Sequence, residues 1–357
     1  MCELNGFILI LVSLDNRAIK FKFVLSLSSD VRMPKPVFCF TSFIYLFLAA
    51  LFFSPEASAV VEKETYWIRF VHSITNPGSV TVRNVRVLIA VPSDCSSQKI
   101  LQIKPEGDGK SPFSLEHDQY GQAVYVFRVS RVDPGKTLNF GYSCTAKFNK
   151  LLPNDKALGQ NSKADVSKGI PLKIKQTYTK DVQRIYDLNN PLILKLARQF
   201  LSGYPQIGDR VRAIHYYVAS NLKYQMEGNW ESAPNVLLSR RGSCSEFSYA
   251  FGALCRATGI PTRFVGGSRL RKALPYNDLT GHRWSEVYFP GSGWIAFDPT
   301  LDAKAPKKLS YLGTFYQPSL ITFRGGGGSS LLGNAYNSTN SKRNQLKRKR
   351  QFFWRQN

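Results

Sequence analysis

Hydrophobic and polar positions alternate in short runs between residues 66 and 129. These runs cover residues 66–71, 80–89 and 123–129, and turn sequences such as Asn76-Pro77-Gly78 separate them. Alternation puts every second side chain on one face of an extended chain. The pattern predicts a small antiparallel β-sandwich, which we assign to residues 60–149.

The hydrophobic spacing changes farther along the chain. Hydrophobic residues recur every three or four positions in 192–201 and 211–222, which predicts two helices. A third helix is expected to begin at Cys244 and to end before Gly259-Ile260-Pro261, because glycine and proline commonly follow a helix.

Strand patterns return after these helices, at residues 262–265, 284–289 and 294–297. Helices followed by strands predict an α+β domain, which we place at residues 188–310. The polar stretch 150–187 is interpreted as a linker. The glycine-rich and basic stretch 311–357 is interpreted as a flexible basic C-terminal tail.

An apolar segment precedes the sandwich. Residues 37–53 follow Lys35 and lead to Ala57-Ser58-Ala59. A basic start, an apolar core and small residues at the end are typical of a secretory signal peptide, so residues 33–59 are predicted to be one, cleaved after Ala59. The alternative is an uncleaved membrane anchor through residues 37–53. Both interpretations export the rest of the chain, to the periplasm or the extracellular space. Residues 1–32 are then interpreted as an over-extended gene start.

Charge and cysteine content refine this picture. The formal net charge is +24, which would attract an anionic polymer of the cell envelope. No nucleic-acid-binding motif accompanies the charge, so no specific nucleic-acid partner is expected. Cys95 and Cys144 lie in the strand-rich part of an exported chain, where they form either a disulfide or two free buried thiols.

Three residues carry candidate chemistry. Cys244 stands in Gly242-Ser243-Cys244, at the expected start of a helix, where the helix dipole favours a thiolate. His282 opens one strand and Asp298 closes the next, so an antiparallel pair of these strands would bring the two side chains together. The spacing predicts a nucleophile, a proton partner and an orienting carboxylate. A metal site is not expected, because the dense Cys and His spacing of zinc sites is absent.

Four segments around these residues resemble the core motifs of the transglutaminase-like superfamily. They are Arg241-Gly242-Ser243-Cys244, Gly259 to Gly267, His282 to Tyr288, and Gly293 to Thr300. The resemblance extends over about residues 188–300. It implies a papain-like α+β fold in which Cys244, His282 and Asp298 act as the catalytic triad, without a cofactor, and exported bacterial members often place a β domain first.

The resemblance leaves the reaction open between acyl transfer to an amine and hydrolysis. The expected substrate is a protein or peptide amide. Trp284 and Trp294 either wall the cleft or pack in the core, and Trp230 is a further candidate for shaping the acyl site. The rival interpretation is a non-catalytic interaction module that binds an anionic envelope polymer or a protein partner.

Overall fold

A computed structural model describes residues 9–15, 18–24, 63–108, 112–149, 169–226, 230–314, 317–327, 335–337 and 346–357. Contacts divide the chain into residues 1–60 and residues 61–357. In the first unit, β1 (Leu9–Asp15) and β2 (Ala18–Val24) form an antiparallel hairpin. The apolar segment 37–53 lies outside the described residues, so the signal peptide and the anchor both stay predictions. No helix in the described part of the chain is long and apolar enough to span a bilayer.

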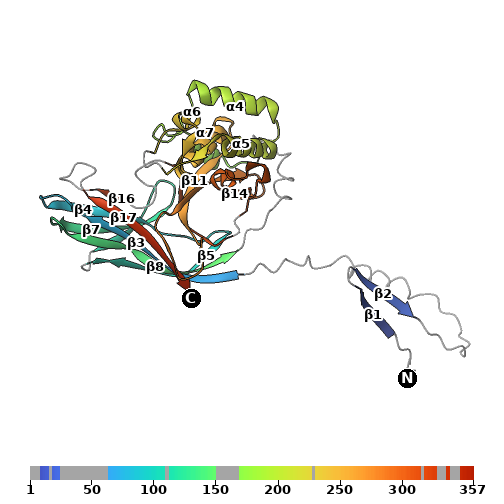
Figure 1. The fold of residues 1–357 in the computed structure, drawn as a ribbon, viewed down its shortest axis with the longest axis horizontal. Coiled ribbons are helices and arrows are strands. Elements are labelled where there is room, and N and C mark those ends of the chain that lie inside the picture. Colours follow the sequence, from blue (N-terminus) through green and yellow to red (C-terminus); the bar gives the residue numbers. More distant parts are fainter. Residues whose placement is uncertain are drawn as a thin grey trace, which may run out of the picture. The chain divides into compact units, whose positions relative to one another are not determined.

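The second unit contains a β-sandwich of two antiparallel sheets (Figure 1). One sheet has the strand order β12-β17-β3-β8-β5, and the other has the order β16-β4-β7-β6. Buried side chains of both sheets pack in one core, as Ile68 and Val87 illustrate. The strands are β3 (Lys63–Thr75), β4 (Val82–Ala90), β5 (Gln98–Gly107), β6 (Phe113–His117), β7 (Ala123–Val132), β8 (Thr137–Asn149), β12 (Tyr276–Asp278), β16 (Ala335–Asn337) and β17 (Lys347–Gln356).

The interpretation of residues 311–357 as a flexible tail was wrong for the described parts of that stretch. β15 (Ser319–Gly325) pairs with a strand of the α+β region, and β17 pairs with β3 along its whole length. Figure 1 shows β17 in red beside β3 in blue. Phe352 and Trp354 are buried in the sandwich core, and this burial stabilises a strand whose other residues are mostly basic or polar.

The α+β region combines helices with a four-stranded antiparallel sheet of order β14-β13-β11-β15. Figure 1 shows the helices gathered above this sheet. The predicted third helix is confirmed as α7, which is buried along almost its whole length and contacts β13 and β11. The elements are α4 (Pro191–Gly203), α5 (Ile207–Asn221), β9 (Lys223–Tyr224), α6 (Ala233–Ser239), β10 (Arg241–Gly242), α7 (Cys244–Ala257), β11 (Thr262–Arg269), β13 (His282–Phe289), β14 (Gly293–Phe297), α8 (Pro299–Asp302) and the 3-10 turn η2 (Pro306–Lys308).

Part of the stretch 150–187 is ordered structure rather than linker. Residues 150–168 lie outside the described residues, but α3 (Leu172–Tyr178) follows them. Tyr186 is buried in the core of the α+β region, and its hydroxyl donates a hydrogen bond of 2.7 Å to the carbonyl oxygen of Gly326. Interpreting the whole stretch as a linker overlooked Val182, Ile185 and Leu188, which flank Tyr186 and pack against the same core.

The disulfide between Cys95 and Cys144 is absent, and both thiols are free. Cys144 is buried in the sandwich core, where desolvation raises the pKa of its thiol to about 12. Cys95 instead packs against a separate cluster that contains Val265 and Trp284. The two side chains belong to different packing clusters and both thiols are free, but only Cys144 is buried as that alternative expected, because Cys95 is half-buried.

Candidate active site

The N-terminus of α7 is built by a local capping box around Cys244. The side-chain oxygen of Ser243 accepts a hydrogen bond from the backbone N–H of Ser245 at 3.3 Å. In return, Glu246 accepts the backbone N–H of Ser243 at 2.9 Å and also the Ser243 hydroxyl. A Cβ atom on Gly242 would lie 2.4 Å from the Cβ of Glu246, so only glycine fits there without a shift. These contacts fix Cys244 in the first turn, where the helix dipole stabilises a negative charge.

The hairpin of β13 and β14 brings the other two residues together. Ser285 of β13 pairs with Phe297 of β14. His282, which precedes Ser285, and Asp298, which follows Phe297, therefore lie at the same end of the hairpin. The Nε2 of His282 lies 2.5 Å from an oxygen of Asp298, and both side chains are buried. His282 and Cys244 line the same cleft, and the imidazole interacts with the thiol of Cys244. The structure therefore places Cys244, His282 and Asp298 in one continuous chain of contacts.

The electrostatics of the three residues favour an ion pair. Burial raises the pKa of the Cys244 thiol, but the hydrogen bond and charge of His282, with the nearby Arg283, bring it below its ordinary value. Burial likewise opposes protonation of His282, yet Asp298 and Cys244 raise the pKa of the imidazole. Desolvation opposes ionisation of Asp298, but the charge and hydrogen bond of His282, the charge of Arg269 and the backbone N–H of Leu301 together lower the pKa of the carboxyl. All three shifts favour the charged forms, namely thiolate, imidazolium and carboxylate, relative to the isolated side chains.

Asp298 has its own support. It caps α8, accepting the backbone N–H of Leu301 at 3.3 Å. The last residue of α8, Asp302, lies 2.8 Å from the Nε2 of His215, which comes from α5. Both partners of this second pair are buried. The pair ties α8 to α5 and so holds the carboxylate of Asp298 against His282.

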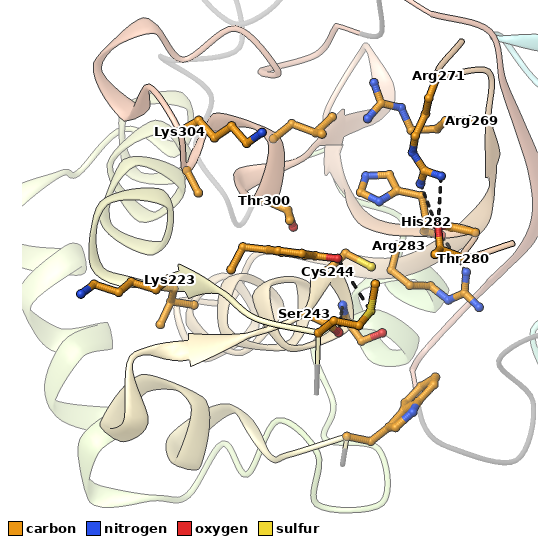
Figure 2. Close-up of a pocket in the computed structure, with 18 of the residues that line it drawn as sticks. Lys223, Ser243, Cys244, Arg269, Arg271, Thr280, His282, Arg283, Thr300 and Lys304 are labelled. Carbon is orange, nitrogen blue, oxygen red and sulfur yellow. Dashed lines mark hydrogen bonds between the residues drawn. The ribbon is translucent and has the colours of Figure 1, made fainter. Parts of the chain in front are cut away.

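A cleft of about 740 Å³ opens beside Cys244 and His282 (Figure 2). Apolar side chains such as Leu222 and Met226 line part of it. The rest is strongly basic, because six cationic residues line the cleft: Lys223, Arg269, Arg271, Arg283, Lys304 and Arg350. Figure 2 shows labelled members of this set on both sides of Cys244. The sequence did not single them out, because they come from separate elements.

The three tryptophans fall into two groups. Trp230 lines the cleft, and its ring centroid lies 6.2 Å from that of Tyr249. Trp284 does not line it. Its ring is buried and stacks on His282 at 5.8 Å, so it supports the imidazole from within the core. Trp294 packs beneath the guanidinium of Arg263 at 4.2 Å and is not part of the cleft either. Trp284 therefore packs in the core, whereas Trp294 is half-buried outside both the core clusters and the cleft.

No group of three or more His, Cys, Asp or Glu side chains is arranged to hold a metal ion among the residues that the structure describes.

Comparison with known proteins places this geometry in a family. Residues 194–299 match the model of the transglutaminase-like superfamily. The chain is 29% identical over 133 residues to the uncharacterised protein YebA of Bacillus subtilis, which covers 32% of this chain and 18% of that protein. It is 34% identical over 77 residues to a protein-glutamine gamma-glutamyltransferase of Pseudomonas aeruginosa, covering 20% of this chain and 11% of that protein. The chain thus spans less than a fifth of either relative.

A solved structure supports the fold over more of the chain. A protein of Cytophaga hutchinsonii, named as a candidate cysteine protease, superposes with a TM-score of 0.54 at 17% identity. The match covers 82% of this chain and 99% of that one. The fold class is therefore α+β, papain-like, with a β domain beside it. The family match, taken by itself, assigns residues 194–299 to the transglutaminase-like superfamily.

Proposed function

We propose that this protein is a cysteine-dependent enzyme that cleaves or transfers amide bonds of proteins or peptides through a thioester on Cys244. The observation that carries the proposal is the contact chain from Cys244 through His282 to Asp298 at the edge of an open cleft. The family match supports a cysteine enzyme in general terms. Export from the cytoplasm belongs to the proposal too, and the predicted signal segment supports it.

In the first half of the cycle the Cys244 thiolate attacks the carbonyl carbon of the amide. The oxygen that becomes negative can be stabilised by the backbone N–H of Cys244, since first-turn N–H groups have no acceptor inside the helix. As the C–N bond breaks, the imidazolium of His282 gives its proton to the leaving amine. The products are a thioester and a neutral imidazole.

In the second half, water or a primary amine enters the cleft. His282 takes a proton from it, the new bond to the carbonyl carbon forms, and the C–S bond breaks. The thiolate and the imidazolium are restored. Asp298 stays ionised throughout and holds the Nε2 side of His282, so the other ring nitrogen faces the sulfur.

The test measures the rate of iodoacetamide alkylation of Cys244 against pH, by peptide mass spectrometry. Cys255 serves as an internal control, because it lies on the same helix but is fully buried, and burial raises the pKa of its thiol. We expect Cys244 to react well below pH ~8.5, the value of a free thiol. Replacing His282 by Ala should move this profile to higher pH.

Labelling of Cys244 with an ordinary thiol profile would contradict the proposal and favour the non-catalytic module. If the thiol is activated, a glutamine-rich protein incubated with a fluorescent primary amine separates the two reactions. Amine incorporation identifies a transferase, and release of ammonia or of peptide fragments without incorporation identifies a hydrolase. Cys244→Ala serves as the inactive control in both assays.

A further inference from the structure

The charge of the cleft is unbalanced. Six of its lining residues are cationic, and no Asp or Glu lines it within the described part of the chain. Arg271 forms an ion pair of 2.6 Å with Asp278, a residue that does not line the cleft, and this carboxylate neutralises its charge. Arg283 is buried against the site and donates a hydrogen bond of 2.7 Å to the carbonyl oxygen of His282. Its charge also favours the thiolate of Cys244, so it has a structural and electrostatic role.

Arg350 differs from these residues. It comes from β17, in register with His72 on β3, and it lies on the strand face that Phe352 and Trp354 bury in the sandwich. Its side chain is half-buried and reaches the cleft. Among the described residues no carboxylate lies within ion-pair distance of its guanidinium. The β domain thus contributes to the cleft of the α+β domain a cation that forms no direct ion pair with a described carboxylate.

An unpaired charge in a half-buried place carries a desolvation cost. Burial lowers the pKa of Arg350, while Cys244 and the carboxylate of Asp278, which is not within ion-pair distance of it, act in the opposite direction. A guanidinium binds a carboxylate through two parallel hydrogen bonds, which would offset that cost. Lys304 and Lys223 are exposed at the cleft and add to the same positive field.

We propose that the cleft selects acyl donors that carry a carboxylate close to the amide under attack, and that Arg350 is the specificity-determining residue that binds this carboxylate. The inference rests on the proposed function, because it names the substrate class of the same site. Acidic peptides meet the requirement in two ways: through an Asp or Glu side chain, or through a C-terminal carboxylate. Both are ionised at neutral pH.

The experiment compares two alkylating reagents on the full chain. Iodoacetate is an anion and iodoacetamide is its neutral analogue, so the ratio of their rates at Cys244 reports attraction of a carboxylate, while the iodoacetamide rate alone reports the thiolate. For Arg350→Gln we expect the iodoacetate rate to fall more than the iodoacetamide rate, lowering the ratio by about three- to tenfold, as for one lost charged contact. Higher salt should reduce the ratio for the unmodified protein.

The matched control is Lys349→Gln. Lys349 is the neighbouring residue of the same strand, is exposed, and does not line the cleft. It carries the same charge, so its loss should leave the ratio unchanged. Lys304→Gln is a second test variant on an exposed residue of the cleft, and it keeps the inference testable if Arg350→Gln fails to fold. It should lower the ratio by a smaller factor.

Three peptides then identify the source of the carboxylate by protecting Cys244 from iodoacetamide. Acetyl-Gly-Glu amide carries a side-chain carboxylate, acetyl-Gly-Gln a C-terminal one, and acetyl-Gly-Gln amide none. Protection by either acidic peptide, weakened in Arg350→Gln, supports the inference and names the source. Equal protection by the neutral peptide overturns it.

Two further results would overturn the inference while leaving the proposed function intact. One is an unchanged ratio in Arg350→Gln. The other is an equal fall with both reagents, which would mean that Arg350 only stabilises the thiolate. An ordinary pH profile with iodoacetamide refutes the proposed function instead, and it leaves the reagent ratio readable.

Discussion

Acidification is expected to destabilise the β-sandwich through His72. This side chain is 2% exposed, and neither ring nitrogen has a hydrogen-bond partner in the described residues. Burial, with the charges of Arg348 and Arg350, lowers its pKa from 6.5 to about 3. The folded protein therefore holds His72 neutral at pH values where the unfolded chain has already bound a proton.

The sign and size of the effect follow from that difference. Protonation of His72 does not reduce the free energy of unfolding above pH 6.5, where the side chain is neutral in both states. Between pH 6.5 and about 3 only the unfolded state binds this proton, so the free energy of unfolding decreases as the pH falls. The loss is about 1.4 kcal/mol per pH unit within that window, which amounts to roughly 2 kcal/mol at pH 5.0.

The measurement is urea unfolding at pH 7.5 and pH 5.0, with His72→Leu as the comparison. Leucine keeps an apolar side chain in the sandwich and cannot titrate. Between pH 7.5 and pH 5.0 the free energy of unfolding should decrease by about 2 kcal/mol more for the unmodified protein than for His72→Leu, because all other titrating groups are common to both. Equal losses would refute the argument, and would mean that the ring is protonated without penalty. Because His72 is paired in register with Arg350, its protonation should also weaken the strand that supplies the cleft cation.

Three further predictions concern the site and its support. Gly242→Ala should destabilise the protein by about 1–3 kcal/mol, because the added methyl would lie 2.4 Å from the Cβ of Glu246, and thermal unfolding measures this. Asp298→Asn should leave the fold intact and shift the alkylation profile of Cys244 to higher pH, since the imidazolium loses its carboxylate; an unshifted profile would argue against the orienting role. Trp354→Ala should cost about 3–5 kcal/mol, because the ring is fully buried, and a cost near zero in urea unfolding would show that the C-terminal strand is dispensable.

The sequence by itself determined the candidate site residues and the elements that carry them. The signals are local: Gly242 and Ser243 prepare a helix start at Cys244, and one short connection joins the strands that present His282 and Asp298. A hairpin places the first residues of one strand opposite the last residues of the next, so the contact between the side chains of His282 and Asp298 could be predicted. The transglutaminase-like motifs are short segments of this kind, which is why they were visible without a structure.

Only the tertiary structure decided the role of the C-terminal residues. β17 pairs with β3, from the opposite end of the second unit, and no local pattern can reveal so distant a partner. The basic residues of this strand led to its interpretation as a flexible tail, although Phe352 and Trp354 are buried. The same long-range pairing brings Arg350 to the cleft, and separate packing clusters keep Cys95 from Cys144. Sequence spacing determines what neighbours along the chain can do, whereas the charge of the cleft depends on which distant strands pack together.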